Sequence, residues 1–369
     1  MWSVTSGANM KDNEKAKVGM DGDRRYEAGF SLMELLAAMV IFMVVSGSIY
    51  GVLQVARQSR GAVSNNVQLT KNARLGLNLV GRDTYNAGFG YPLLHSVVIR
   101  NARIAPLLGT PPDTDNTRDL VPPIIAGNNI TLNTFNQAPN VHTDQVTFLF
   151  KDSTFNLVGV GDRAVSQPLN INAATTTGTG IDEIVPISGS NASCRINDLY
   201  LITGNNGSTL AVATGLSGTN KIQFANGDPL GFNQTGATGI LRNITTPASI
   251  VRVRMITYYV TADGTLMRRE YVNQPPPSVA AFVDEPLVYG VENFQIRYVL
   301  DDGSEVDNPS AGPDGIPGTA DDDLAALAAV RQVRVTISAR TTELDARGQP
   351  VRINETATFS TRNLGYDAN

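Results

Sequence analysis

A run of 22 residues without a charged side chain, Leu35–Ala56, most constrains what this chain can fold into. As a helix it would be about 33 Å long, which is enough to span the hydrocarbon core of a bilayer. Lysine and arginine are more numerous before the run than directly after it, so the preceding segment should stay in the cytoplasm and the rest should be exported. A single carboxylate, Glu34, stands at the start of the run.

Three interpretations of this segment compete. The first is a plain signal anchor, and the second is a secretory signal peptide cut at Ser46-Gly47-Ser48, which leaves a chain that starts at Ile49. Both leave Glu34 unexplained, because an unpaired carboxylate in an apolar helix is costly. In the third, the chain is cut after Gly29, and the new amine of Phe30 lies one helical turn from Glu34 and neutralises it, within one chain or between neighbours.

The residues Gly29-Phe30-Ser31-Leu32-Met33-Glu34-Leu35-Leu36 resemble the processing site of type IV prepilins and pseudopilins. The resemblance implies that a prepilin peptidase removes the leader 1–29 and methylates the amine of Phe30. It also implies that Glu34, the fifth residue of the mature chain, pairs with an N-terminal amine during assembly. Such an attraction is strong only where water is absent, as inside a bundle of helices. The leader is longer than many in the family, so Met20 is an alternative start.

The helical pattern continues beyond the apolar run. Hydrophobic residues recur at three- and four-residue steps, and Gly88, Gly90 and Pro92 end the pattern. We predict one long helix over 30–86, with a transmembrane part at 30–56 and an amphipathic part that packs on a sheet.

Ten short segments with strand character follow, separated by turns rich in Gly, Asn and Asp. The predicted fold class is α+β, with the long N-terminal helix packed on a large antiparallel β-rich head domain. We expect 101–140 to be a long loop with one short hairpin, and 261–264 to be a hairpin turn. The predicted strands are 144–150, 181–187, 198–204, 208–214, 221–224, 248–260, 265–272, 287–300, 330–340 and 350–362.

The resemblance extends to the C-terminal part of the chain. The order of the segments within 258–340 is similar to that of PilW-like minor pilins and of the J-type minor pseudopilin of type II secretion, and 81–90 resembles the segment that closes their long helix. Residues 101–247 show no such likeness. We therefore interpret 87–247 as a loop- and strand-rich variable insertion and 248–369 as a C-terminal antiparallel β region.

An acidic loop, 301–323, holds eight acidic residues and neither Lys nor Arg. Such a density repels itself unless it is solvated or neutralised by a cation. Oxygen ligands in a loop rich in Gly and Pro suit Ca²⁺, and the loop resembles calcium-binding loops of secreted proteins, although its spacing does not fit an EF-hand. A solvated loop without metal is the alternative. The candidate calcium ligands are Asp301, Asp307, Asp314, Asp321, Asp322 and Asp323.

Composition argues against several other functions. A net charge of −5 gives no basic footprint of a nucleic-acid binder. One cysteine, Cys194, and two histidines are too few for a zinc site, and Cys194 is expected to be a small apolar residue with no reactive role. The sequence contains none of the common catalytic motifs, so we expect no enzyme and no required cofactor.

The resemblance implies a minor pilin-like structural subunit that primes or caps assembly of a type IV pilus through its N-terminal helix. A head of about 280 residues, with a radius of gyration of about 19 Å, is too bulky to repeat at every step of a thin filament. The implied partners are prepilin peptidase, other minor pilins, the major pilin and the inner-membrane assembly platform, with no nucleic acid. The implied location is the inner membrane, with the leader in the cytoplasm and the head in the periplasm, and later a pilus or pseudopilus. The alternatives are a minor pseudopilin of type II secretion, or a tip adhesin that binds a surface ligand through 101–247.

Overall fold

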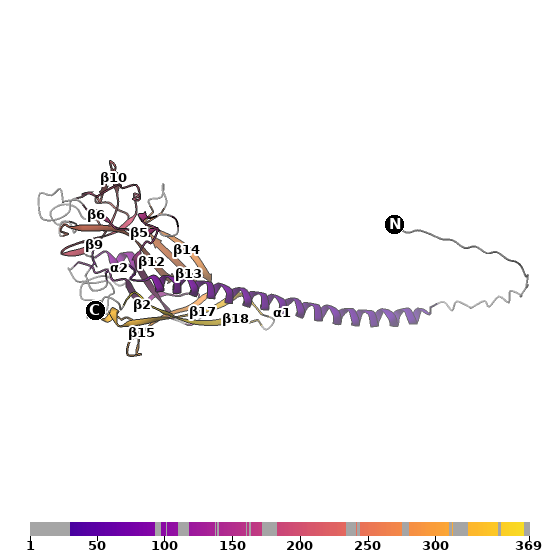
Figure 1. The fold of residues 1–369 in the computed structure, drawn as a ribbon. Coiled ribbons are helices and arrows are strands. Elements are labelled where there is room, and N and C mark those ends of the chain that lie inside the picture. The colour runs from indigo at the N-terminus through magenta and orange to yellow at the C-terminus, as the bar shows by residue number, and fades with distance from the viewer. Residues whose placement is uncertain are drawn as a thin grey trace, which may run out of the picture. The chain divides into compact units, whose positions relative to one another are not determined.

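A computed structural model gives the fold (Figure 1). The chain divides into two compact units after Arg57. The first contains the apolar part of helix α1 (Leu32–Asn86), and the second contains the rest of α1 and all the described strands. The structure describes residues 30–364 except 93–96, 101, 110–117, 137, 139, 160, 162–163, 172–182, 234–240, 242–243, 275–279, 310–311, 313–323 and 346–347.

Helix α1 ends at Asn86 because the following backbone turns left-handed. Gly88 and Gly90 have φ angles of 79° and 61°, a region that glycine enters without steric cost. The amide of Gly88 donates to the carbonyl of Leu149 in β3 (His142–Lys151) at 2.9 Å. The end of the helix is therefore tied directly to a strand of the head.

The larger sheet has nine strands, and β12 (Ala248–Val260) is its centre. The first half of β12 pairs with β6 and β8, and the second half pairs with β3 and β13. Strands from before and after residue 247, the expected boundary between the insertion and the C-terminal region, thus lie in one sheet. Among the described strands of this sheet, only the β1–β9 pairing is parallel. The remaining strands are β1 (Val97–Val98), β2 (Ile124–Leu132), β6 (Leu169–Ile171), β8 (Leu199–Gly204), β9 (Gly207–Val212), β13 (Thr265–Tyr271) and β14 (Phe282–Tyr289).

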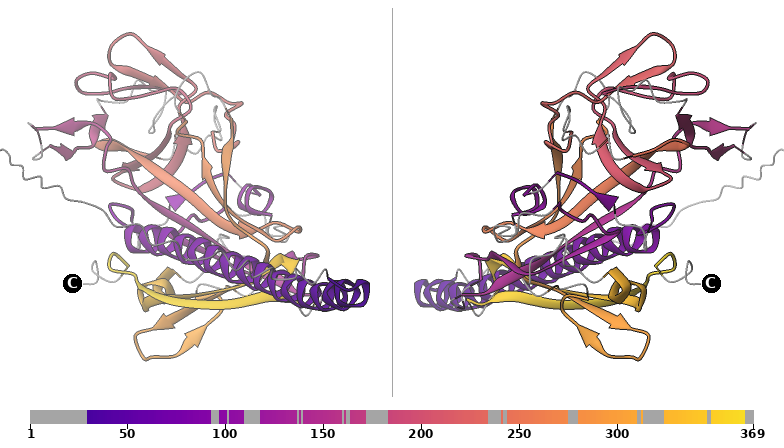
Figure 2. Two further views of the ribbon diagram at one scale, coloured as in Figure 1. Left: turned by 90° about the vertical axis from the view of Figure 1, so that its right-hand side faces the viewer. Right: turned by 90° about the vertical axis from the view of Figure 1, so that its left-hand side faces the viewer.

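A second sheet of four antiparallel strands has the order β16-β15-β17-β18. The amphipathic part of α1 lies between this sheet and the larger one (Figure 2). The strands are β15 (Val291–Leu300), β16 (Glu305–Val306), β17 (Val330–Leu344) and β18 (Pro350–Ser360). The smaller elements are α2 (Ile104–Leu108), α3 (Leu324–Ala328), β4 (Leu157–Val158), β5 (Val165–Ser166), β7 (Ile184–Pro186), β10 (Gly215–Ser217) and β11 (Lys221–Gln223).

One hydrophobic core joins the helix to both sheets. The buried residues of α1 in this core are spaced by three or four positions and pack against side chains from both sheets. Two glycines let the helix approach closely: a Cβ on Gly76 would lie 2.9 Å from Val288, and one on Gly81 would overlap with the ring of Phe359. The buried helix residues are Leu69, Ala73, Leu77, Val80 and the following Ala87.

The α+β class and the antiparallel head are confirmed, and the predicted turn 261–264 joins β12 to β13. The prediction of a loop over 101–140 is wrong for β2, which pairs with β3 at both of its ends, over 124–127 and 131–132. The register shifts between Gly127 and Thr131, and Asn129 has a φ of 54°. Residues with turn chemistry therefore form a bulge inside a strand instead of ending it.

The predicted strand 287–300 is two strands in two sheets. The break lies at Gly290, which has a φ of 77°. A Cβ at this position would overlap with the carbonyl oxygen of Arg340, so only glycine fits there. The chain passes at Gly290 from β14 in the larger sheet to β15 in the four-stranded sheet.

Candidate assembly site

Helix α1 begins with a side-chain cap. The hydroxyl of Ser31 accepts a hydrogen bond from the amide of Met33 at 3.3 Å, and its carbonyl accepts one from the amide of Glu34 at 2.9 Å. Serine in this position satisfies amides that the helix leaves without partners. The cap puts Glu34 in the first turn, where a carboxylate also interacts favourably with the helix dipole. This role of Ser31 was not predicted from the sequence, although Ser-x-x-Glu is the signature of a capping box.

Phe30, the predicted methylation residue, and Glu34, the predicted assembly residue, are both exposed. The Phe30 residue is 84% exposed. The carboxylate of Glu34 has no hydrogen-bond or ion-pair partner within the described part of the chain. Gly29, the predicted cleavage position, lies outside the described residues. The available chemistry is therefore electrostatic: one carboxylate that can accept a cation from elsewhere.

The apolar half of α1 presents its side chains outward. Among the described residues, α1 is the one helix whose length and composition suit a membrane crossing, and none of its most apolar stretch is buried. Phe42, Met43 and Val52 are each about 70% exposed, with 71%, 69% and 69%. A continuous apolar surface of this kind is costly in water, so it requires lipid or other helices around it.

Two glycines lie on one side of this apolar helix. Gly47 and Gly51 are four residues apart, and a Cβ built on either meets nothing within 4 Å. Packing against the described part of the chain therefore does not require them to be glycine. Small residues at this spacing let a second membrane helix approach closely. From the sequence, Gly47 was predicted only to be part of the alternative signal-peptide site, and Gly51 was given no role.

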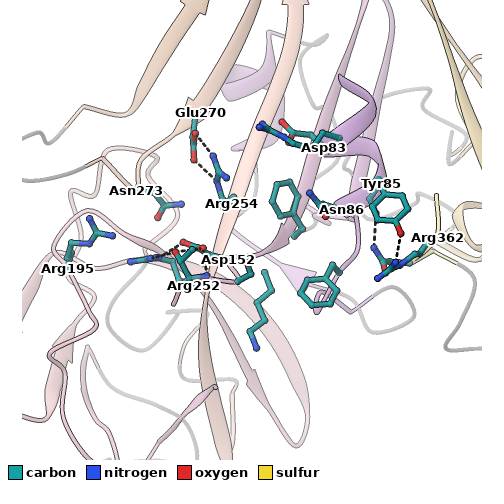
Figure 3. A pocket seen from close by; sticks show the side chains of 17 residues that line it. Asp83, Tyr85, Asn86, Asp152, Arg195, Arg252, Arg254, Glu270, Asn273 and Arg362 are labelled. Carbon is teal, nitrogen blue, oxygen red and sulfur yellow. Dashed lines mark hydrogen bonds and ion pairs between the residues drawn. The ribbon is translucent and has the colours of Figure 1, made fainter. Parts of the chain in front are cut away.

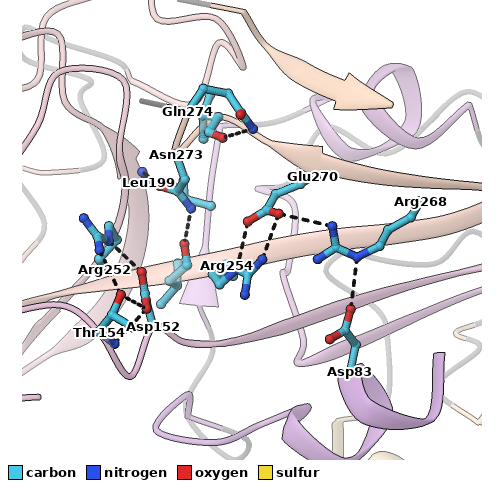
Figure 4. A network of polar contacts seen from close by, with 12 residues as sticks. Asp83, Asp152, Thr154, Leu199, Arg252, Arg254, Arg268, Glu270, Asn273 and Gln274 are labelled. Carbon is cyan, nitrogen blue, oxygen red and sulfur yellow. Dashed lines mark hydrogen bonds and ion pairs between the residues drawn. The ribbon is translucent and has the colours of Figure 1, made fainter. Parts of the chain in front are cut away.

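A buried carboxylate fastens the other end of α1 to the head (Figure 4). Asp83 is 1% exposed. Its carboxylate accepts a hydrogen bond from the Tyr258 hydroxyl at 2.7 Å and forms an ion pair with Arg268 at 3.4 Å. Arg268 also forms an ion pair with Glu270 at 3.3 Å. Glu270 accepts two hydrogen bonds from Arg254, from Nε and from Nη2, each at 2.8 Å. The helix is thus linked through one acid to strands β12 and β13.

The charges in this network support one another. Burial acts to lower the pKa of Arg268, but Asp83, Tyr258 and Glu270 outweigh it and hold that pKa above its usual value. Removing one partner of such a buried pair leaves the other charge uncompensated, which typically costs about 3–5 kcal/mol. Sequence reasoning missed Asp83, although an acid that continues the buried helix stripe was a visible signal.

The acidic loop is described only in part. Asp301 pairs with Arg331 at 3.6 Å, and Asp307 pairs with Arg297 at 2.9 Å. Both carboxylates thus already have a cation beside them. Among the described residues, no group of three or more His, Cys, Asp or Glu side chains could hold a metal ion. The other proposed ligands, Asp314, Asp321, Asp322 and Asp323, lie outside the described residues, so the calcium site stays a prediction.

Cys194 is 4% exposed in the core of the head. Burial raises the pKa of its thiol to about 11. The thiol therefore stays protonated at neutral pH and is a poor nucleophile.

Comparison with known families gives one match. Residues 24–50 match the family described as the prokaryotic N-terminal methylation motif. The matched range contains the predicted cleavage position, Phe30, Glu34 and much of the apolar run. No curated protein and no solved structure matches the chain.

Proposed function

We propose that this chain, a type IV pilin-like or pseudopilin protein by its methylation motif, is a minor subunit that primes or caps assembly of a type IV pilus. The observation that carries the proposal is Glu34: a carboxylate without a partner among the described residues, in the first turn of an exposed apolar helix. Its partner would be the amine of Phe30, created when the leader is removed after Gly29, in this subunit or in a neighbour.

The proposed mechanism is non-covalent. Helices of several subunits pack side by side in the membrane, and the exposed glycines Gly47 and Gly51 allow a close approach. Two unit charges 4 Å apart attract by about 1 kcal/mol in water and by about 4 kcal/mol at an effective dielectric constant of 20. The attraction of Glu34 to an amine therefore becomes strong only after the helices have excluded water. It sets the register of the helices in the nucleus of the filament.

The size of the head, about 280 residues, and its fixed attachment to the helix favour a subunit present in few copies over one that repeats along the filament. Its two sheets pack on both sides of residues 69–87, and Asp83 holds that part of the helix to β12 and β13. A head fixed in this way moves with that part of the helix. We therefore propose a place at the tip or in a priming complex.

The proposed partners follow from this role. Prepilin peptidase would process the leader, and other minor pilins and the major pilin would contact the N-terminal helix. The inner-membrane assembly platform would receive the subunit. Before assembly the chain would cross the inner membrane once, with its leader in the cytoplasm and its head in the periplasm.

Mass spectrometry of the mature N-terminus tests the processing step. We expect an N-methylated Phe30 as the first residue. A mature chain that begins at Ile49, or one that keeps the leader, would contradict the proposal.

The Glu34→Gln variant tests the assembly step. Leader cleavage should remain normal, while incorporation into sheared filaments should fall by at least tenfold. Glu285→Gln is the matched control, since Glu285 is an acid of the head with a side chain that is 61% exposed. Its ion pair with Arg268, at 3.7 Å, is long and exposed to solvent, so little stability depends on its charge. Equal incorporation of both variants would show that the Glu34 charge is dispensable.

A deletion strain separates the pilus from the type II secretion alternative. Loss of surface pili with normal protein export supports the proposal, and the reverse result supports a pseudopilin. A copy number in sheared filaments close to that of the major subunit would contradict the minor role.

A further inference from the structure

A pocket of about 500 Å³ lies where α1 ends, and positive charge collects in it (Figure 3). Its lining carries six cationic and three acidic side chains, whereas the chain as a whole is negative at −5. The cationic residues are Arg82, Lys151, Arg195, Arg252, Arg254 and Arg362, and the acidic residues are Asp83, Asp152 and Glu270.

The acidic side chains of the pocket are already neutralised. Arg252 pairs with Asp152 at 2.8 Å and with Asp198, behind the pocket wall, at 3.0 Å. Arg254 pairs with Glu270 through two nitrogens, each at 2.8 Å. These ion pairs fix the side chains of Arg252 and Arg254. The net positive charge of the pocket therefore comes from its other cationic side chains.

Three arginines at the rim keep donors available. Arg82 and Arg195, with side chains 53% and 39% exposed, each contact an acid through Nε alone, and the exposed Arg362 donates through Nη1 to the hydroxyl of Tyr85. Their other guanidinium nitrogens have no partner within the described part of the chain. Guanidinium groups offer parallel N–H donors that match the two oxygens of a carboxylate. Figure 3 shows Arg195 and Arg362 on opposite sides of the pocket.

Aromatic rings lie beside these cations. Tyr85 and Phe89 are 44% and 43% exposed, and the guanidinium of Arg362 stacks 4.7 Å from the Tyr85 ring centre. Asn86 and Ser153 add an amide and a hydroxyl to the lining. The pocket therefore combines anion-binding groups, an apolar ring face and neutral hydrogen-bonding groups within the volume of a small-molecule site.

We propose that this pocket binds a carboxylated sugar, the acidic unit of a glycan. The carboxylate would pair with Arg82 and Arg362, and the C–H face of the pyranose ring would pack on Tyr85 and Phe89. The ring hydroxyls would hydrogen-bond with Asn86 and Ser153. The proposal goes beyond the assembly role and does not depend on it, because none of these residues lies in the apolar half of α1.

Two other anionic partners fit less well. Nucleic acid is bound along an extended basic surface, whereas the positive charge here is confined to one pocket on a negatively charged chain. The Asp and Glu side chains of an acidic peptide would use the arginines, but these side chains offer no ring face to Tyr85 and Phe89. A carboxylated pyranose uses all three kinds of group.

Isothermal titration of the full chain in detergent with D-glucuronate tests the proposal. We expect saturable binding with a Kd of about 1 mM, weakened at high salt because exposed charges are screened. Uncharged D-glucose should bind at least tenfold more weakly. Arg82→Gln and Arg362→Gln should each weaken glucuronate binding about tenfold.

Arg74→Gln is the matched control. Arg74 lies on the same helix, outside the pocket, with a side chain that is 66% exposed and paired with Glu355 at 3.3 Å. This variant should bind glucuronate as the wild type does, and unchanged thermal unfolding should show that all three variants are folded. The proposal is overturned if glucuronate does not bind, if the pocket variants bind like Arg74→Gln, or if a single-stranded oligonucleotide or polyglutamate displaces the sugar at lower concentration.

Discussion

Removal of the hydroxyl from two buried tyrosines, Tyr258 and Tyr298, should change the free energy of unfolding in opposite directions. Both are almost inaccessible, at 0% and 1% exposure. The hydroxyl of Tyr258 donates to the buried carboxylate of Asp83 at 2.7 Å. The hydroxyl of Tyr298 is buried and has no hydrogen-bond partner among the described residues. The substitution to phenylalanine is chemically the same at both sites, so the environment alone decides the outcome.

The magnitudes follow from these contacts. A hydrogen bond to a buried charge contributes about 1.5–3 kcal/mol, so Tyr258→Phe should lower the free energy of unfolding by about 2 kcal/mol. A buried hydroxyl without a partner retains its desolvation cost of about 1–3 kcal/mol. Tyr298→Phe removes that cost and should raise the free energy of unfolding by about 1 kcal/mol. The two variants should therefore differ by about 3 kcal/mol.

Urea unfolding of the full chain in detergent, followed by circular dichroism, measures both values. The dependence on urea should keep its slope, so that the shift in midpoint reports stability. In an Asp83→Asn background the cost of Tyr258→Phe should shrink, because the charge that strengthens the bond is gone. Equal destabilisation by Tyr298→Phe and Tyr258→Phe would contradict this prediction.

Three further predictions concern other parts of the chain. Burial raises the pKa of Asp144 to about 6 from 3.8, so between these two pH values the folded chain binds a proton that the unfolded chain has lost. The free energy of unfolding should therefore fall by up to about 3 kcal/mol between pH 4 and 7, and Asp144→Asn should flatten this dependence in urea titrations. Gly81→Ala should destabilise the head by about 1–3 kcal/mol in the same assay, because the new Cβ overlaps with the ring of Phe359, whereas Gly61→Ala, where nothing lies within 4 Å, should not. Gly51→Leu should leave the unfolding of the head unchanged and reduce incorporation into filaments severalfold, and normal incorporation would exclude close helix packing at this glycine.

The sequence predicts the long helix and the antiparallel head because their signals are local. The charge-free run, the three- and four-residue spacing after it, and Gly88 and Gly90 at its end each act over a few residues. The strand β12 and its turn at 261–264 could also be predicted, since alternation and turn residues determine both. Glu34 stands out for the same reason, because one acid in an apolar run is visible without any tertiary information.

Tertiary contacts decide what the sequence leaves open. The residues 127–129 have turn chemistry, and only the pairing of β2 with β3 shows that they form a bulge. Gly290 lies in a continuous strand-like segment, and only the nearby carbonyl of Arg340 shows why the chain changes sheets there. The cations of the pocket come from positions as far apart as 82 and 362, and no local motif announces a site assembled over such distances.

Asp83 contacts both the sheet that holds the helix and an arginine of the proposed glycan pocket. Its Oδ2 atom accepts from Tyr258 and Arg268 on the sheet side, while its Oδ1 atom holds Nε of Arg82 at the pocket rim at 3.0 Å. A change at Asp83 would therefore loosen the helix and release Arg82 together, so its effect on binding would be ambiguous. Arg82 is different, because its side chain is 53% exposed and Asp83 keeps its two sheet partners without it. Loss of glucuronate binding in Arg82→Gln without loss of stability would thus separate the pocket from the fastening of the helix.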